Sequence, residues 1–543
     1  MIKEPAIKQQ SDRGAAVTTS PWGPLGVTIF RWLWIASVAS NLGTWMQSVG
    51  ATWLMTLLTP SPVLVALMQT ATSLPVFLVG LPAGAIADVV DRRKLLLVSQ
   101  GWMLVVAVLL GLLATLNLLS AGVLLLLTFL LGLGSALNAP AWQAIVPELV
   151  GKRMVAQAIA LNSAGYNLAR AIGPALGGIV VAASGPGAVF FLNAASFLGV
   201  LVVIWRWQRP HVESLTPPEN VVGAIAAGTR YAGHSRSLQA VLVRVAVFIV
   251  AASALWALLP VVASHDLSLD AGGYGVLLGS LGVGAILGAV FIHRLNAILS
   301  TDQLTVLASL AFGFATLALG YIHVIALLLP MLALGGVAWM VMMSSLNVAA
   351  QGAAPDWVRA RALGIYLLVF QGGMALSSFT WGALAEWLGN GTALLLAALG
   401  LGMSVLAALR WPLHNIQNLD LSPAIYQPQP DLAVTPRAAD GPVMVTVEYR
   451  VLPDRYQEFV TSMQRVGRVR RRTGAFQWGL FQDPADPQRF TETYFTRTWA
   501  EYTRQQTRAT VTDQAIQEAA IALTAPGTTP RVSPLIAAEP PRH

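Results

Sequence analysis

The sequence has 543 residues, of which 55% are hydrophobic and only 11% are charged. Soluble proteins carry roughly 25% charged residues, so this composition excludes an ordinary soluble protein and indicates a chain that lies mostly in a bilayer. The lack of cysteine excludes disulfides, thiolate metal sites and cysteine nucleophiles. The seven histidines show no metal-ligand spacing, so we expect no metal, no cofactor and no enzymatic activity.

The formal net charge of +8 does not indicate a nucleic-acid-binding protein. Residues 1–410 hold 19 Lys and Arg against 12 Asp and Glu, whereas residues 411–543 hold 14 against 13. The positive excess therefore belongs to the apolar part of the chain, where basic loops have another role. We expect a lipid bilayer as the environment and no nucleic acid as a partner.

Residues 1–27 form a polar N-terminal tail without an apolar stretch and cleavage site, so we predict no removable signal peptide. Beyond it the sequence predicts an α-helical membrane protein with twelve transmembrane helices in two six-helix halves. The halves are residues 28–205 and 239–410, and a cytoplasmic central loop joins them at 206–238. A spanning helix needs about 20 mainly apolar residues, and twelve segments provide them near 32–57, 63–87, 95–117, 122–146, 155–183, 188–205, 239–263, 273–292, 303–322, 325–350, 362–385 and 392–410.

Lysine and arginine occur in every second loop between these segments. The loops at 59–62, 118–121, 184–187, 264–272 and 386–391 contain none. Basic loops stay in the cytoplasm, so we predict an inner-membrane protein with both termini cytoplasmic. The loops on that side carry Arg92, Arg93, Lys94, Lys152, Arg153, Arg206, Arg209, Arg230, Arg236, Arg294, Arg359 and Arg361.

A weak repeat relates the two halves. The heptapeptides PELVGKR (147–153) and PDWVRAR (355–361) share Pro, an acid, Val and Arg at the same positions, 208 residues apart. Each follows a helix with a Leu-Asn pair, at Asn138 and at Asn347. Internal repeats are typical of secondary transporters, whose substrate sites lie between the repeats. The alternative is two similar loop caps.

The segment GAIADVVDRRK (84–94) resembles the signature loop of the major facilitator superfamily. The matching residues are Gly84, Asp88, Arg92 and Arg93, whereas the glycine that usually follows the acid is Asp91 here. The resemblance, which covers about residues 28–410, implies a transporter that works by alternating access.

Asp88 lies at a predicted helix end, where the helix dipole disfavours a negative charge. The resemblance implies that it contacts the start of the helix after Arg359 and Arg361, and that this contact latches the two halves on the cytoplasmic side. The alternative is that Asp88 and the basic cluster only fix the topology.

The segment GPALGG resembles the helix-5 motif of the superfamily's exporters, through Gly173, Pro174, Gly177 and Gly178. Together with SNLGTWMQSVGATWL (40–54), it is similar to the branch that contains the enterobactin exporter. This implies export of an amphipathic small molecule, such as a siderophore or a drug. It also implies that the glycine face packs on the glycine-rich segment 279–289.

Arg170 lies inside the same predicted helix, on one face with Asn162, Tyr166, Gly173 and Gly177. A charge at this depth is rare and usually functional, and no Asp or Glu lies in the middle of a predicted span. The sequence leaves three roles open: capping carbonyls near the Pro174 bend, binding an anionic substrate, or gating. The candidate cavity residues are Asn41, Asn138, Tyr166 and Arg170.

The superfamily's proton-coupled drug exporters often carry an arginine at the position of Thr128. They also often carry an acidic residue in the first span. Neither is present here, so no mid-membrane carboxylate supports proton coupling.

Residues 411–440 are rich in proline and predict a linker, and residues 441–538 predict a soluble α+β domain. Its strands and helices are expected at 443–451, 454–472, 476–483, 489–496, 499–508, 513–523 and 531–538. This β-α-β-β-α-β order resembles the ferredoxin-like domain of small antibiotic-biosynthesis monooxygenases, which implies pairing into a homodimer. The run Arg468, Arg470, Arg471 and Arg472 is either a solvated face or a contact with anionic lipid.

The sequence therefore favours an exporter with a cytoplasmic ferredoxin-like tail and a small-molecule substrate. A membrane-anchored sensor that uses the tail for ligand binding or dimerisation is the alternative. A membrane-tethered monooxygenase would require turnover by the tail, which has no histidine between Gly441 and Pro541.

Overall fold

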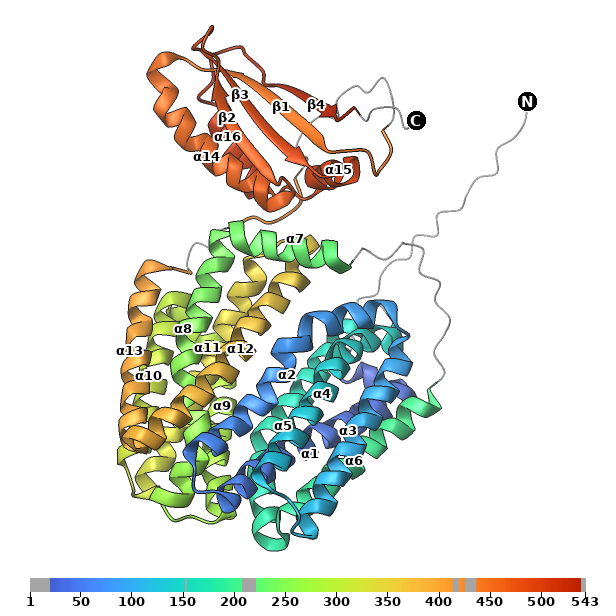
Figure 1. Cartoon of the computed structure of the whole chain (residues 1–543), viewed down its shortest axis with the longest axis vertical. Coiled ribbons are helices and arrows are strands. Elements are labelled where there is room, and N and C mark those ends of the chain that lie inside the picture. Colours follow the sequence, from blue (N-terminus) through green and yellow to red (C-terminus); the bar gives the residue numbers. More distant parts are fainter. Residues whose placement is uncertain (1–19, 152–153, 208–220, 414–418, 425–435, 539–543) are drawn as a thin grey trace, which may run out of the picture.

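The structure is a computed structural model, which describes residues 20–151, 154–207, 221–413, 419–424 and 436–538. One group of long helices, the N-terminal half, contains α1 (Thr28–Leu58), α2 (Pro62–Val89), α3 (Arg92–Thr115), α4 (Ala121–Val150), α5 (Val155–Ser184) and α6 (Pro186–Arg206). The other, the C-terminal half, contains α8 (Arg236–Val261), α9 (Ala271–Ile298), α10 (Thr301–Tyr321), α11 (Ile325–Gly352), α12 (Asp356–Leu388) and α13 (Asn390–Arg410). Figure 1 shows the halves side by side, with residues 436–538, the tail, at one end of the bundle. We call that end the tail side and the opposite end the far end.

Eleven helices of the described part are long and apolar enough to cross a membrane. They are α2 to α6 and α8 to α13, so eleven of the twelve predicted spans are supported. The twelfth, α1, has 31 residues but does not meet the same criterion. Its sequence includes four tryptophans and the polar residues Asn41 and Gln47, which lower its hydropathy. Because α1 packs between α5 and α6 inside the half, its polar side chains face other helices.

The first cytoplasmic loop of the prediction is a tight helix-to-helix connection. Asp91 is the N-cap of α3, and its carboxylate accepts a hydrogen bond from the Lys94 backbone N–H at 3.0 Å. Aspartate is a preferred N-cap because it satisfies an otherwise unpaired N–H group. The aspartate that replaces the usual motif glycine therefore starts the next helix.

The central segment, predicted only as a loop, contains the helix α7 (Val221–His234). Figure 1 shows α7 lying across the tail-side ends of the C-terminal half, beneath the tail. The Tyr231 hydroxyl donates to the Ala353 carbonyl oxygen at 2.8 Å, and a Cβ at Gly228 would lie 2.9 Å from the Arg361 Cβ. Burial raises the pKa of Tyr231, so the phenol remains a donor. This helix is therefore packed on α12 and on the link that precedes it.

The two heptapeptides of the repeat do not occupy equivalent positions. Pro147 lies inside α4, which continues to Val150, whereas Pro355 is the N-cap of α12. The motif proline therefore lies inside a helix in one half and at a helix start in the other, because proline fits the first turn of a helix and is also tolerated as a kink within a membrane helix.

The tail is a four-stranded antiparallel sheet with helices. Its strands are β1 (Val443–Arg450), β2 (Gln477–Gln482), β3 (Arg489–Thr496) and β4 (Arg531–Ile536), in the order β2-β3-β1-β4. Its helices are α14 (Tyr456–Thr473), α15 (Trp499–Thr507) and α16 (Val511–Ile521). The predicted pairing of the two strands around PADPQ is confirmed, with Trp478 opposite Tyr494. Alternate residues of β1 and β3 are buried against α14, which gives the tail its own apolar core around Phe459, Met463 and Tyr494.

Candidate functional site: a cavity between the two halves

The halves meet in a close backbone contact between α5 and α9. A Cβ at Gly178 would lie 2.7 Å from both the Ala271 carbonyl oxygen and the Gly275 Cα, and a Cβ at Gly282 would lie 2.7 Å from the Ala171 carbonyl oxygen. No side chain fits at these distances, so glycine is required. Small residues at such contacts allow membrane helices to approach each other closely.

The predicted polar and glycine face of α5 exists, but it packs on α1 and not on the glycine-rich helix α9. A Cβ at Gly173 would lie 2.6 Å from the Trp45 Cβ, and one at Gly177 would lie 2.8 Å from the Met46 Cα. Gly178 follows Gly177 by one residue, which turns the helix by about 100°, and it therefore faces α9. The motif glycines thus serve two different contacts.

Other contacts join the halves at the far end. The rings of Trp53 on α1 and Tyr274 on α9 are stacked, with centroids 5.7 Å apart. The Ser61 hydroxyl, before α2, donates to the Glu386 carboxylate of α12 at 2.7 Å. Deeper in the bundle, the Thr70 hydroxyl donates to the Ala375 carbonyl oxygen at 2.7 Å. The far end is therefore closed by contacts between the halves.

A cavity of about 450 Å³ lies between the halves. Residues of α1, α2 and α5 line it on one side, and residues of α8, α9 and α11 line it on the other. On the tail side of the close contact at Gly282, both helices line the cavity, through Ala164 and Asn167 on α5 and Ala289 and Val290 on α9. The lining also includes Thr52, Val65 and Pro260, which lie nearer the far end, so the cavity occupies the middle of the bundle.

Arg170 lies in the wall of this cavity. Its guanidinium carbon is 5.8 Å from the centre of the Trp45 ring, which is within the range of a cation–π contact. Tyr166 meets the same ring edge-on, at 6.5 Å between centroids. Within the described residues Arg170 has no hydrogen bond or ion pair. The capping of carbonyls near Pro174 is therefore not observed.

The other three candidate cavity residues lie outside the lining. Asn138 accepts hydrogen bonds from Ser99 and from Gln100 of α3, each at 3.2 Å, because it occupies the face of α4 that packs inside the N-terminal half. Asn41 lies nearer the tail-side end of α1 than the lining residues, which begin at Trp45. Tyr166 is 46% exposed and reaches the cavity only through its contact with Trp45. The described lining therefore includes Arg170 and none of these three residues.

The wall opposite Arg170 is aromatic. Trp256 on α8 and Trp339 on α11 line the cavity, and their rings meet edge-on at 5.2 Å. The lining contains several polar side chains, including Ser48, Thr52 and Gln69, but no aspartate or glutamate. The cavity therefore combines one cation with a mainly apolar and aromatic surface.

The predicted latch residues take partners within their own halves. Arg92 forms an ion pair with Glu148 of α4 at 2.6 Å, and Arg93 donates to the Trp205 carbonyl oxygen at 2.7 Å. Arg359 pairs with Asp356, three residues earlier in α12, at 2.7 Å. The side chain of Asp88 lies outside the described part. A Cβ at Gly84 would meet no atom within 4 Å, so this motif glycine makes no tight contact in the present arrangement.

A profile of the family described as transmembrane secretion effectors matches residues 19–542, which include the tail. The chain belongs to this family. The protein is therefore a multi-pass membrane transporter of the major facilitator type.

Two relatives of this transporter differ in what their names say they carry. The multidrug efflux pump Tap of Mycolicibacterium fortuitum is 24% identical over 419 residues, which are 75% of this chain and 99% of Tap. The staphyloferrin A transporter of Staphylococcus aureus is 27% identical over 176 residues, which are 32% of this chain and only 44% of that transporter's length.

Solved transporter structures share the fold of this chain. The nucleoside transporter NupG is 12% identical, with a TM-score of 0.59, over 71% of this chain and all of NupG. A POT family transporter in complex with 5-aminolevulinic acid is 14% identical, with a TM-score of 0.58, over 72% of this chain and 96% of that chain. At these identities the likeness concerns the fold alone.

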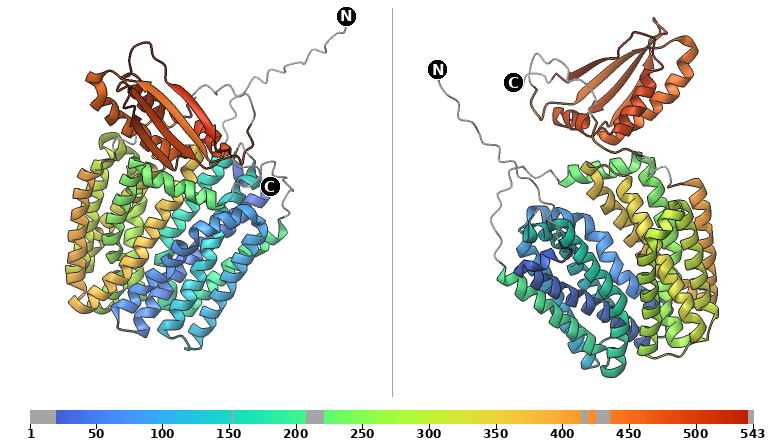
Figure 2. Two further views of the ribbon diagram at one scale, coloured as in Figure 1. Left: turned by 45° about the horizontal axis from the view of Figure 1, so that its top comes forward. Right: turned by 180° about the vertical axis from the view of Figure 1, so that it is seen from behind.

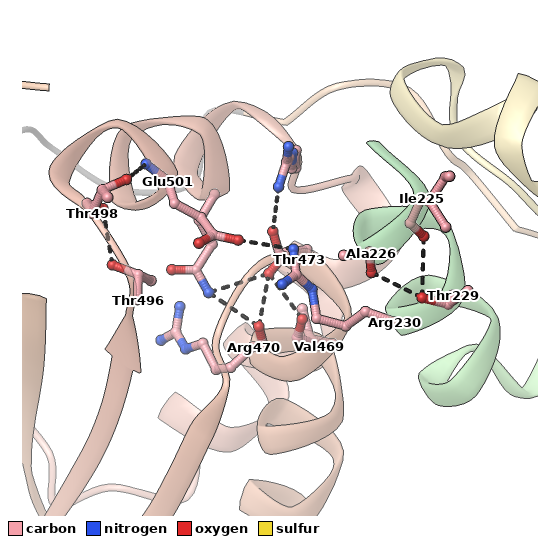
Figure 3. A network of polar contacts seen from close by, with 12 residues as sticks. Ile225, Ala226, Thr229, Arg230, Val469, Arg470, Thr473, Thr496, Thr498 and Glu501 are labelled. Carbon is pink, nitrogen blue, oxygen red and sulfur yellow. Dashed lines mark hydrogen bonds and ion pairs between the residues drawn. The ribbon is translucent and has the colours of Figure 1, made fainter. Parts of the chain in front are cut away.

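The tail of this transporter is attached to the bundle through α7 and the start of α12. Figure 3 shows Arg230 of α7 facing Glu501 of α15, with an ion pair of 2.9 Å whose side chains are each 17% exposed. The Arg508 guanidinium lies over the Trp357 ring at 4.5 Å, and the Arg472 guanidinium lies over the Tyr231 ring at 5.7 Å. These contacts all reach α7 or the C-terminal half.

The predicted basic run of the tail does not form one solvated face. Arg470 is 1% exposed and pairs with the fully buried Glu492, with Nε–Oε1 at 3.0 Å and Nη2–Oε2 at 3.3 Å. Tyr449 and Trp478 also donate to the Glu492 carboxylate, each at 2.9 Å. Such a buried charge is stable only with full hydrogen bonding, so this network fixes α14 against the sheet.

Sequence reasoning missed Arg244, a buried residue in the third turn of α8. It forms an ion pair with Asp302 and a hydrogen bond with Thr305 of α10. Asp302 also accepts from the Leu413 backbone N–H at 3.0 Å, which ties the chain after α13 to the bundle. The signal was present, because Arg244 lies inside the predicted span 239–263 and Asp302 lies just before the span 303–322.

Proposed function

We propose that this protein is an inner-membrane exporter of anionic, amphipathic small molecules that works by alternating access. The observation that carries the proposal is the cavity between the halves, whose lining includes Arg170, the aromatic pair Trp256 and Trp339, and no carboxylate among the described residues. Pockets of this kind are mostly apolar with a few polar groups that orient the ligand. The guanidinium would bind the anionic group, and the aromatic wall would hold the apolar body.

The two ends of the bundle indicate which state of the transport cycle the structure represents. The far end is closed by contacts such as Trp53–Tyr274, and part of the cavity lining, including Ala164 and Val290, lies on the tail side of the closest contact between α5 and α9. The distribution of basic loops supports a cytoplasmic tail side. We infer that the structure is an inward-facing state, which would load substrate from the cytoplasm. The names of the relatives, a multidrug efflux pump and a siderophore transporter, are compatible with siderophore-like or drug-like cargo.

Asp88 would form the latch in the opposite, outward-facing state. In the present arrangement Arg92 and Arg359 have partners within their own halves. Closure of the tail side would bring the end of α2 toward the start of α12. The carboxylate of Asp88 would then be stabilised by the positive end of that helix.

The tail would be a ferredoxin-like domain that pairs with a second copy. Its strand order β2-β3-β1-β4 and its helix positions support the resemblance to small antibiotic-biosynthesis domains. Sedimentation of purified residues 436–538 tests this idea, and a dimer is the expected result. A folded monomer would remove the pairing and leave the fold.

A second role, regulation by the tail, is favoured by the attachment through Arg230 and Glu501. A tail that binds a ligand or a second copy would act on α7 and, through it, on α12. Deletion of residues 436–538 should leave partial export if the tail regulates transport. A regulatory role would be rejected if the deletion variant exported at the full-length rate at every substrate concentration.

Export itself is tested by comparing small molecules in the culture medium of cells with and without this protein. An anionic amphipathic compound should accumulate outside the cells that have the protein and inside the cells that lack it. Identical media, with the protein present in the membrane, would reject the proposed export.

A further inference from the structure

Helix α14 carries five arginines within its last two turns and a half, and they have different surroundings. Arg470 is buried against Glu492, and Arg472 forms an ion pair with Asp513. Arg471 lies over the Trp478 ring at 5.5 Å. The remaining two, Arg465 and Arg468, have no ion pair to a described carboxylate. The structural contacts of the tail therefore do not account for these two charges.

Arg465 and Arg468 lie on the face of α14 that meets the bundle. They precede Arg472 by seven and four residues, and residues at these spacings share one helix face. Arg472 lies over the Tyr231 ring of α7. Arg236 begins α8, two residues after α7 ends at His234. The fold thus brings Arg236 of the bundle and two arginines of the tail to one place.

The electrostatics agree with this placement. Burial lowers the pKa of Arg468, and the nearby charges of Arg236, Arg465 and Arg471 lower it further. Like charges that gather in this way oppose folding unless an anion compensates them. Within the described residues Arg236 has no carboxylate partner either. The cluster therefore has the charge of an anion site whose anion comes from outside the chain.

This cluster lies at the level where the membrane surface is expected. Arg236 is the first residue of a candidate span. The neighbouring helix α13 ends at the same side with Arg410, whose guanidinium lies over the Trp411 ring at 5.5 Å. Tryptophan and basic residues are enriched at the membrane–water interface. An anion at this level is most simply the phosphate of a lipid headgroup.

We propose that Arg236, Arg465 and Arg468 bind the phosphate of an anionic phospholipid in the tail-side leaflet. The lipid would hold α14 at the membrane surface and would add a second attachment of the tail beside α7. The guanidinium groups suit a phosphate because they donate in a planar fork. The proposal does not depend on which substrate the cavity carries.

The test uses the full-length protein in nanodiscs of phosphatidylcholine, with or without added phosphatidylglycerol. Hydrogen exchange of α14 reports the contact, and native mass spectrometry counts the phosphatidylglycerol that stays bound. Phosphatidylglycerol should slow the exchange of α14. In the double variant Arg465→Gln/Arg468→Gln the lipid should bind roughly thirtyfold more weakly, because each basic residue near an anionic surface contributes about fivefold.

The matched control is Arg497→Gln/Arg531→Gln, which removes two exposed arginines of the tail outside α14. It should behave as the unmodified protein. Arg236→Gln changes the bundle instead of the tail, and a roughly fivefold loss is expected there. Equal lipid binding by the unmodified protein and by both cluster variants would overturn the proposal. The proposal would also be overturned if inorganic phosphate slowed the exchange of α14 as much as phosphatidylglycerol does. The site would then bind free phosphate instead of a lipid headgroup.

Discussion

The guanidinium of Arg170 lies in the cavity wall beside Trp45, and the described residues offer it no carboxylate. A cation in a low-dielectric site attracts an anion more strongly than it does in water. The planar fork also fixes the orientation of a bound carboxylate or catecholate. At the scale of single residues, Arg170 is therefore the position at which we propose that substrate charge is recognised.

Arg170→Ala should lower the affinity for an anionic substrate by about tenfold or more, since a hydrogen bond to a charged group contributes roughly 1.5–3 kcal/mol. Arg170→Lys should keep part of the affinity, because it retains the charge and loses the fork. The measurement is substrate binding to purified variants with unchanged melting temperature. Arg294→Ala, which removes an exposed arginine at the tail-side end of α9, is the control. Unchanged affinity in Arg170→Ala would exclude this residue as a ligand.

Asp88→Asn should reduce export while insertion stays normal, because the neutral amide loses the attraction to the helix N-terminus that closes the tail side. Export assays at matched protein levels measure the effect. The matched control is Asp91→Asn, since asparagine remains a good N-cap for α3, and this variant should export normally. Normal export by Asp88→Asn at a normal level would reject the latch.

At the scale of elements, α5 and α9 form a close contact between the two halves. Gly178 faces the backbone of α9, and Gly173 and Gly177 face α1. The two neighbouring faces explain why the motif contains glycines at more than one helical position. Residues of this contact, such as Ala171 and Gly282, also line the cavity.

Gly178→Val should destabilise the protein by roughly 1–3 kcal/mol, the typical effect of added volume in a tightly packed contact. It should also separate α5 from α9 at the far end. Gly199→Val is the control, because a Cβ at Gly199 meets no atom within 4 Å. Thermal melting of the two variants gives the comparison. Equal melting temperatures would show that the helices do not meet at Gly178.

At the scale of the whole molecule, the described tail contacts reach α7 and the C-terminal half, including Arg230–Glu501 and Arg508–Trp357. Figure 2 shows the same arrangement from two further directions, with the tail above α7 in both. The tail should therefore move together with that half when the halves rock against each other. We therefore expect a change in this attachment to affect the movement of the C-terminal half.

Arg230→Glu and Glu501→Arg should each loosen the tail, by an amount on the order of 1–3 kcal/mol for a partly buried pair. The double variant restores opposite charges and should recover most of the attachment. Hydrogen exchange of α7 and α15 reports the effect. A double variant no tighter than either single variant would show that the ion pair does not hold the tail.

Periodicity and loop charge were enough to predict eleven supported spans and the tail's strand pairing, because a bilayer and a sheet impose simple patterns on the sequence. The pattern also placed Arg170 on the face that carries Gly173. It could not predict that this face packs on α1, because the periodicity of one helix defines a face but does not determine which other helix packs on it. Asn138 was misplaced for the same reason, and α7 was missed because only tertiary contacts such as Tyr231–Ala353 bury it.

Distances between spin labels at the two ends of the bundle test most directly whether the protein works by alternating access from an inward-facing state. The chain has no cysteine, so introduced pairs are the only labelled sites. One pair, Ala156→Cys and Ile298→Cys, reports the tail-side ends of α5 and α9, and another, Ser184→Cys and His265→Cys, reports the far end. On addition of the exported compound, the tail-side distance should shorten in a fraction of molecules while the far-end distance lengthens. Two distances that stay fixed, or that change in the same direction, would contradict alternating access.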